Sequence, residues 1–396
     1  MNVYGRLGVE PVINAAGTLT RYGSSLMLPE VVEAMVAASG HFVDMTELHV
    51  AAGDRIARLI GVEACHVCAG AAAGITLMAA ATMAGSDPAK IKRLPDAAGM
   101  PSRFVVQRAH HNPFDQALRL TGGTFVDVGP DHAEIETALR RHRGEVAAVY
   151  ATVAWFCLDD ALAVPEMATL AHAAGVPLVV DAAAEVPPLA NLTRFLREGA
   201  DLVAFSGGKA IRGPQASGFI LGRADLVEAC RLNDGPNSAV GRPMKIGKEE
   251  IVGLVAAVES YVSRDHAADA ALWERRVAHV VDTLAGLPGV RAWRQLPRGI
   301  GQLIPHAAVG WDEGAIGVTH AAVQQALLAG PPRIATQRVD AERYAFGGYA
   351  TPELRIHPHT LQEGEVEIVA AHLRERLSTA PGTHTPGGET AASAVL

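Results

Sequence analysis

Short apolar runs alternate with helical segments through most of the chain. The apolar runs predict strands at 65–68, 104–107, 124–128, 146–153, 176–180, 202–205 and 218–221. Between them, the spacing of apolar residues predicts helices at 46–60, from 70 onward, and at 113–120, 133–141 and 165–174. Short buried strands that alternate with helices are typical of a mostly parallel sheet covered on both faces. We therefore expect an α/β fold whose ligands bind at the carboxyl ends of the strands.

The pattern changes at both ends of this alternating region. Four parts are expected along the chain: an irregular arm at 1–30, a large domain at 31–245, a smaller C-terminal α+β domain at 246–377 and a disordered tail at 378–396. A helix should start at Pro29, and a loop should occupy 91–102. The smaller domain should open with one long helix from Gly247 to about Ala267.

The composition narrows the classes of function. The chain has 396 residues, 49% of them hydrophobic, which is enough for a large α/β domain and a smaller one. Its formal net charge of −8 argues against a large basic surface for nucleic acid. The N-terminus lacks a signal pattern, and no uncharged apolar stretch reaches the roughly 18 residues of a membrane span. We expect a cytoplasmic protein with neither a nucleic-acid partner nor a membrane partner.

Cysteines add little to this picture. The four are Cys65, Cys68, Cys157 and Cys230, and the first two have the spacing of half a zinc site. No second pair or group of histidines is present to complete such a site. We expect core thiols and no metal.

One lysine and one aspartate carry the most informative chemistry. Lys209 lies in the turn Phe-Ser-Gly-Gly-Lys-Ala-Ile-Arg-Gly-Pro at 205–214, just after an apolar run, and Asp181 ends the preceding apolar run. An acid and a lysine at the ends of two successive buried strands are what pyridoxal phosphate (PLP) chemistry needs. The lysine forms the Schiff base, and the acid keeps the pyridine nitrogen protonated so that the ring accepts electrons. We expect PLP as the cofactor.

Other interpretations of the lysine turn fit less well. A nucleotide-binding P-loop needs a glycine where Val203 stands and a serine or threonine where Ala210 stands. A glycine-rich loop with an exposed lysine remains the alternative, but it leaves Asp181 unexplained.

Further residues around these two are candidates for holding the cofactor. Gly70, Ala71 and Ala72 open a helix after a strand, where small side chains let backbone N–H groups approach a phosphate. Ser206 can add a hydroxyl to the same phosphate. His110 and His111 follow a strand, and one of them can stack on the pyridine ring. We favour His110 and count it among the catalytic residues; the alternative is a hydrogen-bonded loop histidine.

Arginines are the candidates for binding a substrate carboxylate. Arg355 lies in the strand-like run at 353–359 and can make a two-point contact with a carboxylate. A surface salt bridge is the competing interpretation. Arg212 and Arg242 lie near glycine or proline turns and are further candidates.

Four segments resemble one family of enzymes. They are Ser-Gly-Gly-Lys-Ala-Ile-Arg-Gly-Pro-Gln-Ala-Ser-Gly at 206–218, Val-Asp-Ala-Ala-Ala-Glu-Val-Pro-Pro at 180–188, Ile-Asn-Ala-Ala-Gly-Thr at 13–18 and Gly-Arg-Pro-Met-Lys at 241–245. The chain resembles the fold-type I PLP-dependent enzymes, in the group of selenocysteine synthase and D-glucosaminate-6-phosphate ammonia-lyase, over about 10–377. The resemblance implies Lys209 as the Schiff-base lysine, Asp181 as the partner of the pyridine nitrogen, and a homodimer or larger homo-oligomer.

The resemblance also suggests a type of reaction. The matching region begins near residue 10, so the N-terminal tRNA-binding domain of selenocysteine synthase is expected to be missing. With the acidic charge, this favours the ammonia-lyase branch. We expect a lyase for a small free amino acid, in which Lys209 removes the α-proton, a β-substituent leaves, and ammonia and a 2-oxo acid are released. A racemase, an aldolase, an aminotransferase, a selenium or sulfur transferase on an aminoacyl-tRNA, and a non-catalytic PLP-binding regulator stay open.

Overall fold

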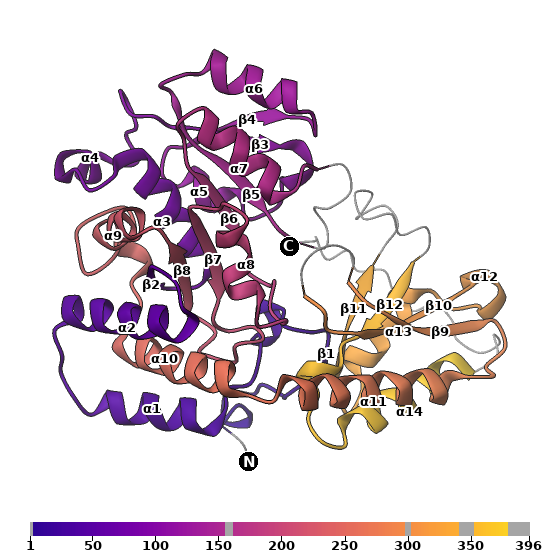
Figure 1. The fold of residues 1–396 in the computed structure, drawn as a ribbon. Helices are drawn as coiled ribbons and strands as arrows, with labels where there is room; N and C mark the ends of the chain where they lie inside the picture. Colours follow the sequence, from indigo (N-terminus) through magenta and orange to yellow (C-terminus); the bar gives the residue numbers. More distant parts are fainter. Residues whose placement is uncertain (1–2, 155–160, 298–301, 340–351, 379–396) are drawn as a thin grey trace.

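The structure is a computed structural model that describes residues 3–154, 161–297, 302–339 and 352–378. A seven-stranded sheet with the order β2-β8-β7-β6-β5-β3-β4 lies at its centre (Figure 1). The strands are β2 (Ala64–Cys68), β3 (Arg103–Gln107), β4 (Thr124–Val128), β5 (Val146–Thr152), β6 (Leu178–Asp181), β7 (Leu202–Ser206) and β8 (Gly218–Gly222). β8 is antiparallel to β2 and β7, and the other neighbouring pairs are parallel. The mostly parallel α/β sheet is confirmed, with strand ends shifted by at most two residues.

Helices cover both faces of this sheet because successive strand residues face opposite layers. In β6, Val180 packs in one apolar layer and Val179 in the other. The first layer receives α1 (Pro29–Ser39), α2 (Met45–Ile60), α6 (His132–Arg141), α7 (Val164–Ala173), α8 (Asn191–Arg197) and α10 (Lys248–Ser263). The second receives α3 (Ala71–Ala84), α4 (Pro88–Arg93), α5 (Asp115–Arg119) and α9 (Ala224–Leu232). Within the described ranges, no helix is both long enough and apolar enough to cross a membrane.

Local side-chain caps explain two differences from the sequence-based helices. α4 extends into the expected loop at 91–102, because Asp87 caps it by accepting from the N–H groups of Ala89 and Lys90. α5 starts two residues later than expected, because the Asn112 side chain accepts from the Phe114 N–H and holds that segment in a turn.

A second sheet has the order β1-β11-β12-β10-β9. Its strands are β1 (Ile13–Ala15), β9 (Val290–Gln295), β10 (His306–Trp311), β11 (Ile334–Val339) and β12 (Glu353–Ile356), and its helices are α11 (His266–Leu284), α12 (Glu313–Ile316), α13 (His320–Ala329) and α14 (Glu365–Ser378). The arm at 1–30 is therefore not wholly irregular, since β1 pairs in parallel with β11. A strand of three residues is too short to produce a recognisable pattern in the sequence.

The long helix expected from Gly247 to about Ala267 is two helices. α10 ends at Ser263, Arg264 is extended, and Asp265 caps α11 by accepting from two N–H groups. The apolar residues of α10 join the large core, whereas those of α11 join the small one. We propose that the domains divide near Arg264 rather than at 245.

Candidate active site

The carboxyl ends of three neighbouring strands form the centre of the site. Asp181 at the end of β6 pairs with Thr152 of β5 and Ala204 of β7. β7 ends at Ser206, and Lys209 follows in the next turn. Lys209 and Asp181 lie close enough that the charge of each alters the pKa of the other.

Asp181 is a buried carboxyl. It is 5% exposed, and its Oδ1 accepts from the Ala183 N–H at 3.0 Å. Burial raises its pKa to about 6, against the opposing effects of Lys209 and of the Ala183 hydrogen bond. Burial likewise lowers the pKa of Lys209, against the charges of Asp181 and Glu185. The low dielectric therefore favours the neutral forms of both groups, and a cationic partner would stabilise the Asp181 carboxylate.

Close backbone packing explains the glycines before Lys209. The Gly207 N–H donates to Ser217 O at 2.8 Å, and Gly213 N–H donates to Gly207 O at 2.8 Å. A Cβ at Gly208 would lie 2.7 Å from Gln215 Cα. Only residues without a Cβ fit at this approach, so the turn presents the lysine from a rigid support.

Glu185 is a member of this cluster to which the sequence assigned no role. It is 3% exposed, and its Oε2 has no hydrogen-bond partner among the described residues. Burial raises its pKa to about 8, against the charge of Lys209. A single acid within the apolar run Ala-Ala-Glu-Val-Pro-Pro at 183–188 was the available signal. A buried carboxyl with an unpartnered oxygen, close to a lysine and an aspartate, is a candidate for proton transfer.

The start of α3 fits the expected cofactor phosphate. Gly70 caps this helix with φ of +93°, which favours glycine, and no side chain caps it. The first N–H groups, including those of Ala71 and Ala72, have no partner within the helix. Gly218 of β8 packs directly against Gly70 and pairs with Ser206. The structure thus brings Gly70, Ala71, Ala72 and Ser206 to one place, where a phosphate can accept from N–H and O–H donors.

We expect Gly218→Ala to release the cofactor more readily and to cost about 1–3 kcal/mol of stability. The new Cβ would lie 2.6 Å from the Gly70 carbonyl carbon and 2.8 Å from Phe205 O, so the phosphate cradle must move. Gly40→Ala is the control, since its φ is −80° and the nearest atom would be Ala37 O at 3.7 Å. Thermal melts and the cofactor retained after dialysis measure both effects. Equal retention in the two variants would contradict the assigned cradle.

The two histidines differ in their surroundings. His110 is 3% exposed, and burial, followed by the charge of His111, lowers its pKa to about 4. His111 contacts Asp115 at 2.5 Å and Asp127 at 2.9 Å. Burial opposes a charge on His111, but its two carboxylate partners raise its pKa overall. A neutral, buried ring suits stacking better than one held by two acids, so the role of His110 stays the preferred prediction.

A cavity of about 180 Å³ lies beside Lys209. Its walls come from the arm (Thr18, Ser25), the lysine turn, the junction of α10 and α11, and the segment 359–362. Arg212 lines it, whereas Arg355 and Arg242 do not. Arg355 is 3% exposed in β12, with its Nε bonded to Glu353 Oε1 at 2.7 Å, and Arg242 is exposed on a short turn. The three arginines remain predicted substrate-binding residues, of which Arg212 has direct access to the cavity.

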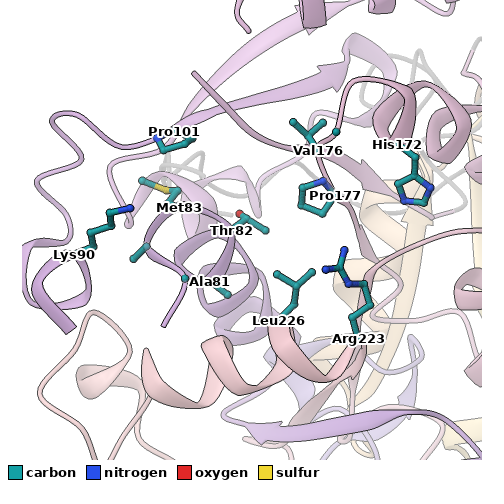
Figure 2. A pocket seen from close by; sticks show the side chains of 13 residues that line it. Ala81, Thr82, Met83, Lys90, Pro101, His172, Val176, Pro177, Arg223 and Leu226 are labelled. Atoms are coloured by element: carbon teal, nitrogen blue, oxygen red, sulfur yellow. The ribbon is translucent and has the colours of Figure 1, made fainter. Parts of the chain in front are cut away.

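A second cavity, of about 580 Å³, lies at the amino ends of the parallel strands, on the side of the sheet away from Lys209 (Figure 2). Pro177, which precedes β6, and Arg223, which follows β8, contribute to its wall together with Lys90 and His172. These positions mark the amino ends of the parallel strands. The cavity is therefore separate from the cluster around Lys209.

The described cysteines belong to the protein interior. Cys65, Cys68 and Cys230 are buried free thiols, and burial raises the pKa of each. Cys157 lies outside the described residues.

Known proteins resemble this chain along nearly its whole length. It is 31% identical to D-glucosaminate-6-phosphate ammonia lyase of Salmonella typhimurium, over 94% of this chain and 97% of that protein. It is 34% identical to 5'-C-glycyluridine monooxygenase-decarboxylase of a Streptomyces species, over 96% and 94% of the two chains. The family model described as SelA, L-seryl-tRNA selenium transferase, matches residues 157–280.

Solved structures agree with these similarities. A structure of D-glucosaminate-6-phosphate ammonia-lyase superposes with a TM-score of 0.79 at 31% identity, over 95% of this chain and 98% of that one. A structure of serine palmitoyltransferase with PLP superposes with a TM-score of 0.60 at 14% identity, over 92% and 87% of the two chains, and shows the shared fold.

The residues around Lys209 fit the cofactor of these enzymes. A buried lysine, a buried carboxylate beside it and a glycine-lined helix start supply an amine, a partner for a protonated ring nitrogen and a phosphate cradle. The chain belongs to the fold-type I PLP-dependent family that contains D-glucosaminate-6-phosphate ammonia-lyase and selenocysteine synthase, and it is a PLP-dependent enzyme.

Proposed function

We propose that this protein is a lyase that eliminates the β-hydroxyl of a free α-amino acid and releases ammonia and a 2-oxo acid. The grouping of Lys209, Asp181 and Glu185 in one buried cluster is the observation that carries the proposal. It combines a base, an acid and a partner for a cationic ring, which are the groups that an elimination requires.

PLP supplies, when bound, a ring that withdraws electrons from the substrate's α-carbon. We infer that Gly70, Ala71, Ala72 and Ser206 hold its phosphate, that Asp181 keeps its ring nitrogen protonated, and that His110 covers the ring. The Lys209 amine then takes the α-proton, because burial favours its neutral form. Arg212 holds the substrate's α-carboxylate from the cavity beside Lys209.

Glu185 supplies the proton that the departing hydroxyl needs. A hydroxide ion is a poor leaving group, so its departure as water requires an acid. Because its pKa is raised to about 8, Glu185 is protonated at neutral pH. Its unpartnered Oε2 is the atom that can donate.

The relatives narrow the substrate class. D-Glucosaminate-6-phosphate and 5'-C-glycyluridine are both α-amino acids that carry a hydroxylated, sugar-derived substituent. We infer the same class for this enzyme. Screening the holoenzyme against both enantiomers of β-hydroxy amino acids, with ammonia and 2-oxo acid measured together, tests the proposal. Racemisation, amino transfer or retro-aldol cleavage without ammonia release would refute the proposed elimination.

The 34% identity to a monooxygenase-decarboxylase supports a second candidate function. An oxidative decarboxylation consumes O₂ and releases CO₂, whereas the proposed elimination needs neither. Turnover compared in air and under argon, with CO₂ measured, separates the two reactions. Strict dependence on O₂ would favour the second candidate.

We also propose a homodimer. Exposed apolar side chains gather on α1 and the segment after it: Val32, Val36, Phe42 and Val43. In PLP enzymes of this family, a second copy is the expected partner for such a surface. Light scattering measures the mass directly; a monomer at micromolar concentration would exclude the dimer.

We expect borohydride to fix the cofactor on Lys209 in the holoenzyme. The other lysines near glycine-rich turns, Lys245 and Lys248, lie on or beside α10 and do not line the cavity. Peptide mapping after reduction identifies the labelled residue. Label on Lys245 or Lys248 would overturn the assignment.

We expect Glu185→Gln to slow the elimination of a β-hydroxyl by about 100-fold or more, since the donor proton is lost. The same variant should process β-chloroalanine at a nearly normal rate, because chloride leaves without a proton. The wild-type rate with hydroxyl substrates should fall as pH rises through about 8, where Glu185 ionises, and this limb should vanish in the variant. An equal loss with both substrates would argue for a structural role instead.

A further inference from the structure

The cavity beside Lys209 contains more positive charge than a substrate carboxylate needs. Arg212, Arg264 and Arg276 line it, and Asp269 is the acid among its described lining residues. Arg264 Nη1 lies 3.6 Å from Asp269 Oδ2, which offsets one charge in part. Glu30 adds a further negative charge nearby, from an exposed position bonded to Ser260. Cations remain in excess within the wall itself.

Two of these cations, Arg212 and Arg264, repel each other. Burial together with the charge of Arg264 lowers the pKa of Arg212. Arg212 also has φ of +63°, an unusual conformation for a residue with a side chain, and its Nε donates to Leu26 O at 2.8 Å. Strained backbone that brings like charges together is typical of ligand-binding sites.

Several polar atoms in the same wall have no partner among the described residues. They are Arg264 Nη2, the hydroxyl of Tyr261 and both ring nitrogens of His359. Tyr261 is 1% exposed, and the Arg264 guanidinium lies over its ring, 5.3 Å from the centroid. Buried polar groups are nearly always hydrogen-bonded. Three neighbouring exceptions around one cavity indicate that a polar ligand completes their bonding.

We propose that this cavity binds a second anionic group of the substrate, a phosphate or a distal carboxylate, through Tyr261, Arg264 and His359. The inference rests on the proposed function in one respect, that the cavity lies beside the reacting carbon of the substrate. The positive charge of the cavity does not depend on that function. Arg212 is committed to the α-carboxylate, so Arg264 is the cation that meets the second anion. Tyr261 and His359 add uncharged donors, since burial lowers the pKa of His359 to about 4 and raises that of Tyr261. The substrate is therefore an amino acid with two anionic ends.

Arg276 has a different task in the wall. Its Nη1 donates to Pro358 O at 2.9 Å and Leu361 O at 2.7 Å. It thereby holds the backbone on either side of His359. A change at Arg276 would disturb the fold of the wall, so it is unsuitable as a test of binding.

Calorimetry on the holoenzyme tests the subsite with two kinds of probe. Inorganic phosphate tests the anion site without any need for catalysis, because the bound cofactor already fills the phosphate cradle at α3. The amino acids norleucine and 2-aminoadipate, each as both enantiomers, differ in the distal carboxylate alone. We expect 2-aminoadipate to bind at least about tenfold more tightly than norleucine, the value of one charge-assisted hydrogen bond.

Two variants should shift this binding in opposite directions. Tyr261→Phe removes one hydroxyl and should weaken phosphate and 2-aminoadipate by about tenfold, with norleucine unchanged. Its Tm should not fall, because the hydroxyl has no partner among the described residues. Asp269→Asn removes a wall acid and should tighten both anions several-fold. Arg58→Gln, at an exposed arginine near the end of α2, is the control and should change nothing.

The outcomes separate this inference from the proposed function. Phosphate binding that weakens in Tyr261→Phe and tightens in Asp269→Asn supports the subsite even if no amino acid is converted. If β-hydroxy amino acids are converted, but 2-aminoadipate binds no more tightly than norleucine and phosphate does not bind, the subsite is overturned and the lyase remains intact. Equal affinities in both variants and the wild type would overturn it as well.

Discussion

Lys209→Ala should lower turnover by about 10⁴-fold or more, because in the proposed mechanism it removes both the attachment point of the cofactor and the base that takes the α-proton. The cofactor should still bind, since the cradle of Gly70 and Ser206 does not depend on the lysine. The lost charge should also raise the pKa of Asp181 and of Glu185, since Lys209 lowers both. Steady-state rates and absorbance of the dialysed protein measure these effects.

Small primary amines provide the decisive control for this variant. Methylamine and ethylamine can enter the space that the side chain leaves and act as the missing base. We expect them to restore part of the rate in proportion to their concentration, and to leave the wild type unaffected. Lys92→Ala, at an exposed lysine in α4, should behave as the wild type. Substantial turnover in Lys209→Ala without added amine would show that another residue is the base.

The positions of the two central residues could be predicted because they are local features of the sequence. Lys209 follows a strand within three residues, and Asp181 ends the neighbouring strand. Parallel strands with buried faces appear as apolar runs, so their order along the chain fixes which ends meet. The glycines around Lys209 had a similar local cause, the close approach of Gly208 to Gln215.

Residues whose roles depend on tertiary contacts were not predictable in the same way. The role proposed for Glu185 depends on its burial and on its hydrogen bond from the Gln302 backbone, a contact far away in the sequence. The position of Arg264 in the cavity wall could not be predicted, because helical periodicity continues across the junction of α10 and α11. The helix breaks there since its two halves pack into different cores. The cap at Asp265, with acidic Asp269 in the first turn, was the signal in the sequence.

Arg355 illustrates a signal that the sequence contained but that a motif does not capture. The predicted strand is present as β12, so Glu353 and Arg355 share one face of it. They form a buried ion pair, each 3% exposed. An arginine alone in a strand suggests a ligand site. When an acid lies two residues away on the same face, as Glu353 does, an ion pair between the two side chains is the alternative. Of the three arginines predicted to bind substrate, Arg212 at the lysine turn is the one that lines the cavity.

Asp181→Asn should separate stability from catalysis. In the wild type, burial raises the pKa of this carboxyl from 3.8 to about 6, so its ionisation disfavours the folded apo-protein. The apo-protein should therefore lose stability as pH rises from about 4 to about 6, and this loss should be absent in the variant. At neutral pH the variant apo-protein should melt at the same temperature as the wild type or higher. Its rate should nevertheless fall by about 10³-fold, since each factor of ten is about 1.4 kcal/mol of barrier and a neutral ring withdraws electrons weakly.

A second buried aspartate in the same sheet provides the matched control. Asp201 is 6% exposed at the opposite edge, where it contacts His172 at 2.8 Å and Arg223 at 3.0 Å. Asp201→Asn should lower the Tm, because it leaves these partners without their acid, and should keep kcat nearly unchanged. Asp181→Asn is thus expected to lower the rate without lowering the Tm, and Asp201→Asn to lower the Tm without lowering the rate. Near-normal turnover in Asp181→Asn would show that a different residue protonates the ring nitrogen, and a lower apo-protein Tm would show that the carboxylate stabilises the fold.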